Sequence, residues 1–288
     1  MIRIRRPKTV PDALRRQRAA GLKRAFAALN AHGAASDELR GALTDYDGGK
    51  SSLFRAQHRK CAFCERRAGL KGSHLEHFRP KKEVHRHLPS SATPIVEAVG
   101  YWWLTWSWSN HLFACSSCNT GYKKNYFPLT AGAAPLAGPQ APYTFKRLQP
   151  AHEALISESA LLVDPAMEDP LDHIEWRLVN PKQPPKLWKW TPTGLTPRGD
   201  ATIEVLGLLA VADDVADHVR HNLLARTQAI CALVDAGQHG AALSAWLLLG
   251  RDVASPRCEL AGPTWNALHL LVDPARRATA SLPDLPRP

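Results

Sequence analysis

The sequence lacks the segments that carry a protein into or through a membrane. No stretch of its 288 residues approaches the roughly 18 uninterrupted apolar residues of a membrane span. Its N-terminal region has no apolar core and no small-residue cleavage site of the secretory type. No repeat recurs at the period of a solenoid or a propeller. These absences predict a cytoplasmic globular protein with no membrane partner.

Acidic residues are scarce at the start of the chain. Nine Lys and Arg residues within the first 24 positions face a single acid, Asp12. This composition imitates a transit peptide, but no serine precedes Ser36, and Leu22, Phe26 and Leu29 fall at helical spacing. Two interpretations stay open: an ordinary helix with a solvated basic face, and an arm that contacts nucleic acid.

The whole chain carries an excess of positive charge. Lys and Arg total 37 against 26 Asp and Glu, which gives a formal net charge of +11 and a pI near 9.6. Because neutralising phosphates drives nucleic-acid association, this excess favours a polyanionic partner. The length allows a substantial core, and one catalytic module with flanking helical parts is the simplest organisation.

Four of the six cysteines form two Cys-x-x-Cys pairs, Cys61 with Cys64 and Cys115 with Cys118. In a cytosolic chain such pairs indicate metal binding rather than disulfides. Two pairs complete the four-sulfur shell that structural zinc prefers, and they would clamp the ends of the intervening 50 residues. An iron–sulfur cluster and unligated thiols are the alternatives. The two remaining cysteines are expected to be ordinary core or surface thiols.

Polar side chains with catalytic potential lie between and just after the cysteine pairs. Glu76 and His77 follow the first pair, Asn110 precedes the second, and Asn119 follows it directly. Phosphodiester hydrolysis needs an activated water and a cation that neutralises developing charge. A histidine that titrates near pH 7 suits the base, and oxygen ligands suit a divalent cation. Adjacent strand residues point to opposite faces, so Glu76 and His77 share a phosphate only if the strand ends or bulges, and Pro80 favours an end.

This order of residues is similar to that of the zinc-containing HNH (ββα-metal) endonucleases. The resemblance implies that His77 is the general base and that Asn110 fixes the loop that orients it. It also implies that Glu76 and Asn119 hold a catalytic Mg²⁺ or Mn²⁺, beside the structural zinc ion of the cysteines. Family members often carry Asp where Glu76 stands, and His74 is an alternative ligand.

Three basic residues are well placed in sequence to touch phosphates: Arg79, Lys123 and Lys124. One of the two lysines is expected on the first turn of the helix that closes the site, and the sequence leaves open which one. The aromatic run from Tyr101 to Trp108 could stack on bases, but its tryptophans alternate as core residues do, which favours packing.

The expected fold class is α+β, with a small zinc-stapled ββα core within a mainly helical chain. We expect four parts: a basic helical region over 1–57, the HNH core over 58–130, a linker with short strands over 131–200, and a C-terminal helical region over 201–288. The Pro- and Ala-rich residues 130–142 are expected to be a linker or surface loop.

Helices are expected over 12–57 with breaks at its glycines, over 200–209 with Asp200 as the cap, over 213–234, and near 241–249 and 263–272. Strands are expected near 71–79, 160–163 and 173–179, and residues 82–100 are expected to form a variable loop with a short helix.

Several segments resemble one HNH subfamily more closely. They are Lys60–Glu65, Leu75–Lys81, Tyr101–Leu104, Trp108–Asn110, Ala114–Asn119 and Phe127–Leu129, followed by Leu161–Pro165, Asp169–Pro170 and Thr202–Leu208. They are similar to the PtuB-type HNH proteins of Septu anti-phage systems, which are also effectors of some retrons. The resemblance implies a defence nuclease that works with a PtuA-type ATPase partner and is restrained until infection. His111 departs from the pattern, because an apolar residue is usual there.

The leading hypothesis is a metal-dependent endonuclease that acts on DNA. RNA, including tRNA, is an alternative substrate, because a ββα core reads the backbone and not the bases. The alternative function is a non-catalytic, zinc-stabilised nucleic-acid-binding module. A toxin that is silent without its partner differs from the leading hypothesis only in regulation. A carboxylate, a base and an amide around one cation favour the enzyme, since a pure binder does not need them.

Overall fold

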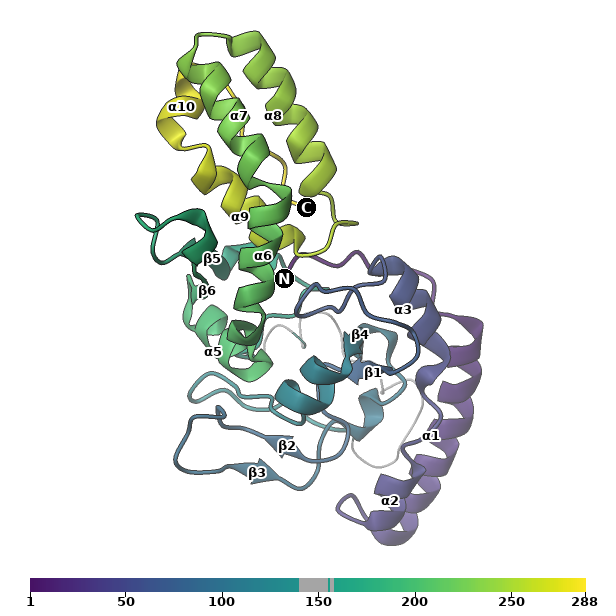
Figure 1. Cartoon of the computed structure of the whole chain (residues 1–288). Coiled ribbons are helices and arrows are strands. Elements are labelled where there is room, and N and C mark those ends of the chain that lie inside the picture. Colours follow the sequence, from purple (N-terminus) through teal and green to yellow (C-terminus); the bar gives the residue numbers. More distant parts are fainter. Residues whose placement is uncertain (140–154, 156–157) are drawn as a thin grey trace.

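The computed structural model describes residues 1–139, 155 and 158–288 (Figure 1). One cluster of buried apolar side chains extends through its helical and stranded parts, and the predicted α+β class is confirmed. Residues 140–142 of the expected linker lie outside the described residues. Within the described ranges, no helix combines the length and the apolar composition needed to cross a bilayer. The division of the chain at residues 57, 130 and 200 stays a prediction.

The N-terminal region folds into α1 (Asp12–His32), α2 (Asp37–Ala42), the 3-10 helix η1 (Asp47–Gly49) and α3 (Lys50–Ala56). The helix predicted from Leu22, Phe26 and Leu29 is confirmed, because all three side chains are buried under α1. The neighbouring Lys23 and Arg24 are exposed, so α1 presents basic side chains to solvent, and both interpretations of this region stay open. Gly33, with φ of +85°, ends this helix.

An antiparallel strand pair lies at the centre of the cysteine-bounded segment. β1 (Ser73–His77) pairs with β4 (His111–Cys115), and His77 stands opposite His111 at the end of the ladder. A π-helical turn, η4 (Ser117–Lys123), follows β4 directly. The strand–strand–helix order of the predicted core is therefore present.

Residues 82–100 form a hairpin and not the predicted loop with a short helix. β2 (Val84–His85) pairs with β3 (Val96–Glu97). The Arg86 guanidinium holds the hairpin on the core, because it donates to the Phe127 carbonyl oxygen and the Tyr101 hydroxyl and pairs with the Glu97 carboxylate. Strands of two residues are too short for their alternation to be visible in a sequence.

The aromatic run that follows is buried, as predicted. It folds into two short 3-10 helices, η2 (Trp102–Leu104) and η3 (Trp108–Asn110), and its tryptophans pack into the core. Gly21 of α1 lies directly against the Trp106 indole, where an added Cβ would clash. This close approach seats α1 on the aromatic run and removes these rings from any nucleic-acid surface.

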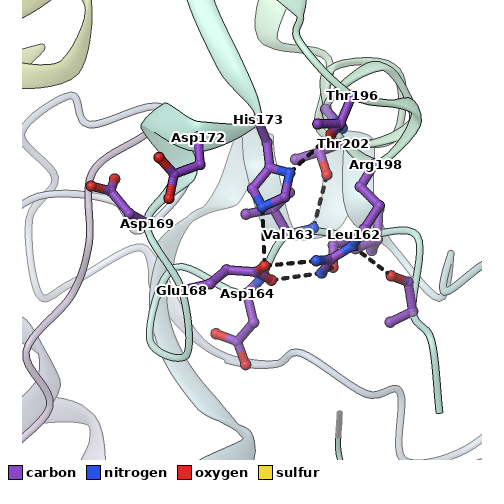
Figure 2. Close-up of polar contacts among 12 residues, drawn as sticks. Leu162, Val163, Asp164, Glu168, Asp169, Asp172, His173, Thr196, Arg198 and Thr202 are labelled. Atoms are coloured by element: carbon purple, nitrogen blue, oxygen red, sulfur yellow. Dashed lines mark hydrogen bonds and ion pairs between the residues drawn. The ribbon is translucent and has the colours of Figure 1, made fainter. Parts of the chain in front are cut away.

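The predicted strand at 160–163 is wrong. Ala160 forms only an isolated bridge with Leu129, the Leu161 amide donates to the Pro128 carbonyl oxygen at 3.0 Å, and side chains satisfy other backbone groups of this segment (Figure 2). The Arg198 guanidinium donates to the carbonyl oxygens of Ala160 (2.9 Å) and Leu162 (3.0 Å). The Val163 amide donates to the Thr202 hydroxyl at 2.9 Å. Both anchoring side chains belong to α5 (Pro197–Leu206).

The same helix anchors the next turn of the chain, which contains η6 (Pro170–Asp172). The Glu168 carboxylate accepts two hydrogen bonds of 2.6 Å from Arg198, and His173 Nε2 lies 3.1 Å from it (Figure 2). The Thr196 hydroxyl caps α5 by accepting from the Gly199 amide, so Asp200 is not the cap that was predicted. Threonine before a proline at the first helical position is the more favourable start.

A second hairpin follows. β5 (Ile174–Leu178) lies where a strand was predicted, and it pairs with β6 (Trp190–Gly194) across η7 (Pro185–Leu187). β6 was missed because Pro192 and Gly194 argue against a strand. In this two-stranded sheet both strands are edges, where a proline is tolerated.

The C-terminal helices are η8 (Leu208–Val211), α6 (Ala212–Asn222), α7 (Leu224–Asp235), α8 (His239–Val253), α9 (Ala261–Leu271) and α10 (Pro274–Thr279). The helix predicted over 213–234 is two helices that meet at the fully buried Leu223. The break lets α6 pack on β6 while α7 packs with α8 in the lobe at the top of Figure 1. The short α10 was not predicted.

Candidate metal centre and catalytic cleft

The four predicted zinc ligands come together. Cys61 and Cys64 lie in the turn after α3, Cys115 ends β4, and Cys118 lies in η4. Their sulfur atoms all lie within 4.8 Å of one another, and those of Cys64 and Cys115 are 3.9 Å apart. Tetrahedral zinc with Zn–S bonds of about 2.3 Å separates its sulfurs by about 3.8 Å. The predicted four-cysteine cluster is confirmed, and its spacing and soft donors fit a structural zinc ion.

The turn that carries Cys61 and Cys64, here called the first knuckle, is joined to β4 by backbone and side-chain hydrogen bonds in addition to the cysteine cluster. The Gln57 side chain donates to the Phe113 carbonyl oxygen (2.8 Å) and accepts from the Phe113 amide (2.9 Å). The Ala62 amide also donates to that carbonyl oxygen at 2.9 Å. The C-terminal region docks on the same knuckle, because Glu65 accepts from the Gly262 amide at the start of α9. The knuckle therefore joins three regions that are far apart in the sequence.

His77 is the last residue of β1, so the strand end that the sequence analysis required is present. His77 Nε2 lies 2.9 Å from the Thr105 carbonyl oxygen. Because a carbonyl oxygen only accepts, Nε2 carries the proton and Nδ1 is the acceptor nitrogen. Burial lowers the pKa of His77 well below its ordinary value, and the nearby Lys81 charge lowers it further. His77 is therefore a neutral imidazole at neutral pH, which is the form a general base needs.

Asn110 fixes the backbone just beyond His77. Its side-chain Oδ1 accepts from the Arg79 amide at 2.8 Å, and its Nδ2 donates to the Arg79 carbonyl oxygen at 3.0 Å. The Asn110 carbonyl oxygen accepts from the Phe78 amide at 2.9 Å. These three bonds hold the chain directly after β1, which is the geometry that the role implied by the resemblance requires.

Glu76 lies in a buried polar cluster with Asn119 and Lys123. Asn119 Nδ2 donates to one carboxylate oxygen, and Lys123 Nζ lies 2.7 Å from the other. Lys123 Nζ also donates to the His77 carbonyl oxygen at 3.2 Å. Burial raises the pKa of Glu76, although the Lys123 charge opposes the shift. A 180° rotation of the Asn119 amide would present its oxygen beside the carboxylate, so the two residues fit a Mg²⁺ ion that keeps several waters.

An open cleft of about 340 Å³ exposes this chemistry. Its lining consists of Tyr46, His74, Leu75, Glu76, His77, Pro80, Lys81, Asn119, Thr120, Lys124 and Asn125. Pockets elsewhere on the described surface are slightly larger, but none of them brings a carboxylate, an imidazole and an amide from the predicted site together. His74 also lines the cleft, with Nε2 2.9 Å from the Ser116 hydroxyl, so it stays an alternative ligand.

The three basic residues predicted to touch phosphates differ in position. Arg79 is buried away from the cleft, where its guanidinium pairs with Glu158 at 2.6 Å, so its expected phosphate contact is corrected. Lys123 is fully buried beside Glu76. It is the last residue of η4 and does not lie on the first turn of that helix, where one of the two lysines was expected. Lys124 is exposed and lines the cleft. Of the two lysines, Lys124 is therefore the one that can reach a phosphate.

Tyr46 and Lys81 are among the residues of the cleft wall that the sequence did not assign to the site. Lys81 carried a usable signal, because it closes the same short motif as His77. Tyr46 carried none, since it lies outside the cysteine-bounded segment and reaches the cleft only through the tertiary fold.

The fold and the site define an α+β protein in which a four-cysteine cluster lies near a cleft that is lined by carboxylate, imidazole and amide groups. The chain is similar to the Septu protein PtuB of Bacillus mycoides (strain KBAB4), with 32% identity over 129 residues. The matched region is 44% of this chain and spans 38% of that protein's length. The predicted resemblance to PtuB is confirmed by this match. No family profile and no solved structure matches the chain.

Proposed function

We propose that this chain is a metal-dependent HNH endonuclease that hydrolyses phosphodiester bonds of nucleic acids. One observation carries the proposal: Glu76, His77 and Asn119 line one cleft, and the hydrogen bond at Nε2 leaves His77 Nδ1 as an acceptor. A module that only binds nucleic acid has no need of a neutral imidazole held in one tautomer beside a carboxylate.

In the proposed reaction His77 Nδ1 takes a proton from a water molecule, whose oxygen attacks the phosphorus. The imidazolium that forms keeps its hydrogen bond to the Thr105 carbonyl oxygen, which stabilises the added charge. Glu76 and Asn119 would hold a divalent cation, which would supply Lewis-acid stabilisation of the charge that develops at phosphorus and on the departing oxygen. Lys124 adds positive charge at the cleft. The phosphorus–oxygen bond to the departing nucleotide breaks, and that oxygen takes a proton from solvent.

The proposed substrate is DNA, with RNA, including tRNA, as the alternative. The net charge of +11 supports a polyanionic substrate of either kind. The similarity to a Septu protein supports a role in anti-phage defence, as part of a Septu system or as a retron effector. A PtuA-type ATPase partner and a cytoplasmic location belong to the same proposal.

A zinc-stabilised binding module is the second candidate, and the buried ion pair favours it. Lys123 already engages one oxygen of Glu76, the carboxylate that the proposal assigns to the cation. A binder needs no ion there, whereas the nuclease must accommodate a cation at the other oxygen, which accepts a hydrogen bond from Asn119.

Cleavage assays with the full chain test the proposal. Plasmid DNA and total RNA are each incubated with the zinc-loaded protein, with and without Mg²⁺ or Mn²⁺, and with and without a candidate ATPase partner. The proposal predicts cutting of at least one substrate that requires the added cation. Binding without cutting under all of these conditions would favour the second candidate.

A further inference from the structure

Lys81 is a cation on the cleft wall to which the proposed reaction assigns no role. Its Nζ lies 3.9 Å from the centroid of the Tyr46 ring, and both side chains line the cleft. In the described part of the chain, no carboxylate lies within salt-bridge distance of this ammonium group. A lysine held over an aromatic face, and not by an acid, leaves its ammonium group available to an anionic ligand.

The Tyr46 ring connects Lys81 to the catalytic histidine. Its centroid lies 4.7 Å from that of His77, with the two rings at 75° to each other. The Lys81 charge acts electrostatically on both His77 and Glu76. The ammonium group therefore lies close enough to the reacting groups to meet the same phosphate.

The fold holds Tyr46 firmly in this position. The turn before it is tied to the buried Trp106, whose indole Nε1 donates to the carbonyl oxygens of Thr44 (3.1 Å) and Asp45 (2.9 Å). Arg24 of α1 pairs with the Asp45 carboxylate at 2.9 Å. Asp45 itself has a φ of +54°, a conformation that Asp adopts more readily than most residues.

We propose that Lys81 binds the scissile phosphate and that Tyr46 is the positioning residue that holds the Lys81 ammonium over the cleft. This inference rests on the proposed nuclease function and names two further residues of the same site. Because Tyr46 lies in residues 1–57, the N-terminal region completes the site, and the expected nuclease core over 58–130 is not sufficient alone.

The test compares Lys81→Gln with Lys82→Gln, an exposed neighbour that does not line the cleft. Single-turnover cleavage and the salt dependence of binding to a short DNA duplex are measured for each full-length variant with its zinc content matched. Lys81→Gln should slow cleavage by about 10- to 100-fold, the worth of one charge-assisted contact. It should also reduce the log–log salt slope of binding by about 1. Lys82→Gln should keep the wild-type rate.

Tyr46→Leu tests the positioning role. It should slow cleavage in the wild-type background and have no further effect in the Lys81→Gln background, because it acts through Lys81. Tyr46→Phe, which keeps the ring face, should rescue the loss. Effects of Tyr46→Leu and Lys81→Gln that simply multiply would overturn this role, since a general loss of packing would be independent of Lys81.

Failure of this inference is distinct from failure of the nuclease proposal. If the wild type cleaves and Lys81→Gln cleaves equally fast with an unchanged salt slope, the Lys81 assignment is wrong and the nuclease stands. If the wild type binds but does not cleave, the nuclease proposal fails and the scissile-phosphate assignment fails with it. The salt slope then decides only whether Lys81 binds a phosphate: a reduced slope in Lys81→Gln shows that contact, and an unchanged slope excludes it.

Discussion

Replacing Lys123 with methionine should cost more stability than a surface substitution, because it leaves the Glu76 carboxylate buried without its partner. The two charged groups lie 2.7 Å apart, and their side chains are 0% and 5% exposed. At an effective dielectric constant of about 20 such a pair attracts by about 6 kcal/mol, much of which is offset by the desolvation of both charges. Removing one partner of a buried pair costs about 3–5 kcal/mol.

The penalty should depend on pH. Burial raises the pKa of Glu76 even with Lys123 present, and loss of that positive charge raises it further. An acid with a raised pKa in the folded state weakens stability as the pH rises above its unfolded value, so the cost of Lys123→Met should grow from there until the pH passes the folded pKa, and it should shrink toward acid.

Urea denaturation at constant zinc, without added Mg²⁺, measures the effect. Lys123→Met is compared with the double variant Glu76→Gln/Lys123→Met, which removes both charges and should recover most of the loss. A cost below about 1 kcal/mol for Lys123→Met, or no recovery in the double variant, would refute the inference that this pair is buried and mutually dependent.

Three further predictions concern the zinc site, a buried histidine and the Arg198 network. Chelation of zinc, or Cys115→Ser, should unfold the segment between the two cysteine pairs, because it removes a metal-binding free energy on the order of 10 kcal/mol. An unchanged near-ultraviolet circular dichroism signal from the tryptophans would argue against this. Burial lowers the pKa of His111 to about 3, so this histidine stays neutral in the fold and contributes a loss of stability of about 1.4 kcal/mol per pH unit as the pH drops below 6.5. His111→Leu should reduce the slope of stability against pH by that amount in urea titrations, and an identical slope would contradict it. Arg198→Met should cost about 1–2 kcal/mol by thermal melting, since it leaves two carbonyl oxygens unpaired beside a partly exposed ion pair; an unchanged melting temperature would count against the role of Figure 2's network.

The zinc knuckles and the strand that ends at His77 could be predicted because their signals are local. Two cysteines on one turn, and a histidine shortly before Pro80, carry their meaning within a few residues. Burial of the tryptophan run was predicted from alternation, but residues 101–108 are all buried and form two 3-10 helices, so the aromatic bulk of the run and not a period of two is the usable signal.

The sequence did not predict which of the basic residues are buried and which line the cleft. Their burial depends on partners far away in the sequence, or on a difference of one position at the end of a helix. Arg79 pairs with Glu158, 79 positions along the chain, and no local pattern announces that contact. Lys123 and Lys124 take opposite positions because η4 ends between them, with Lys124 at a φ of +46°. Tyr46 was not predicted as a site residue for a similar reason, because it lies outside the cysteine-bounded segment and reaches the cleft only in the folded chain.

His77 is proposed as the general base of a nuclease, and removal of its imidazole checks that role. Single-turnover cleavage and nucleic-acid affinity are measured on the same zinc-matched samples of wild type, His77→Ala and His32→Ala, the last being an exposed histidine at the end of α1. We expect His77→Ala to lose cleavage by about 100-fold or more while its affinity changes little, and His32→Ala to behave as wild type. Equal cleavage by wild type and His77→Ala would mean that His77 is not the general base.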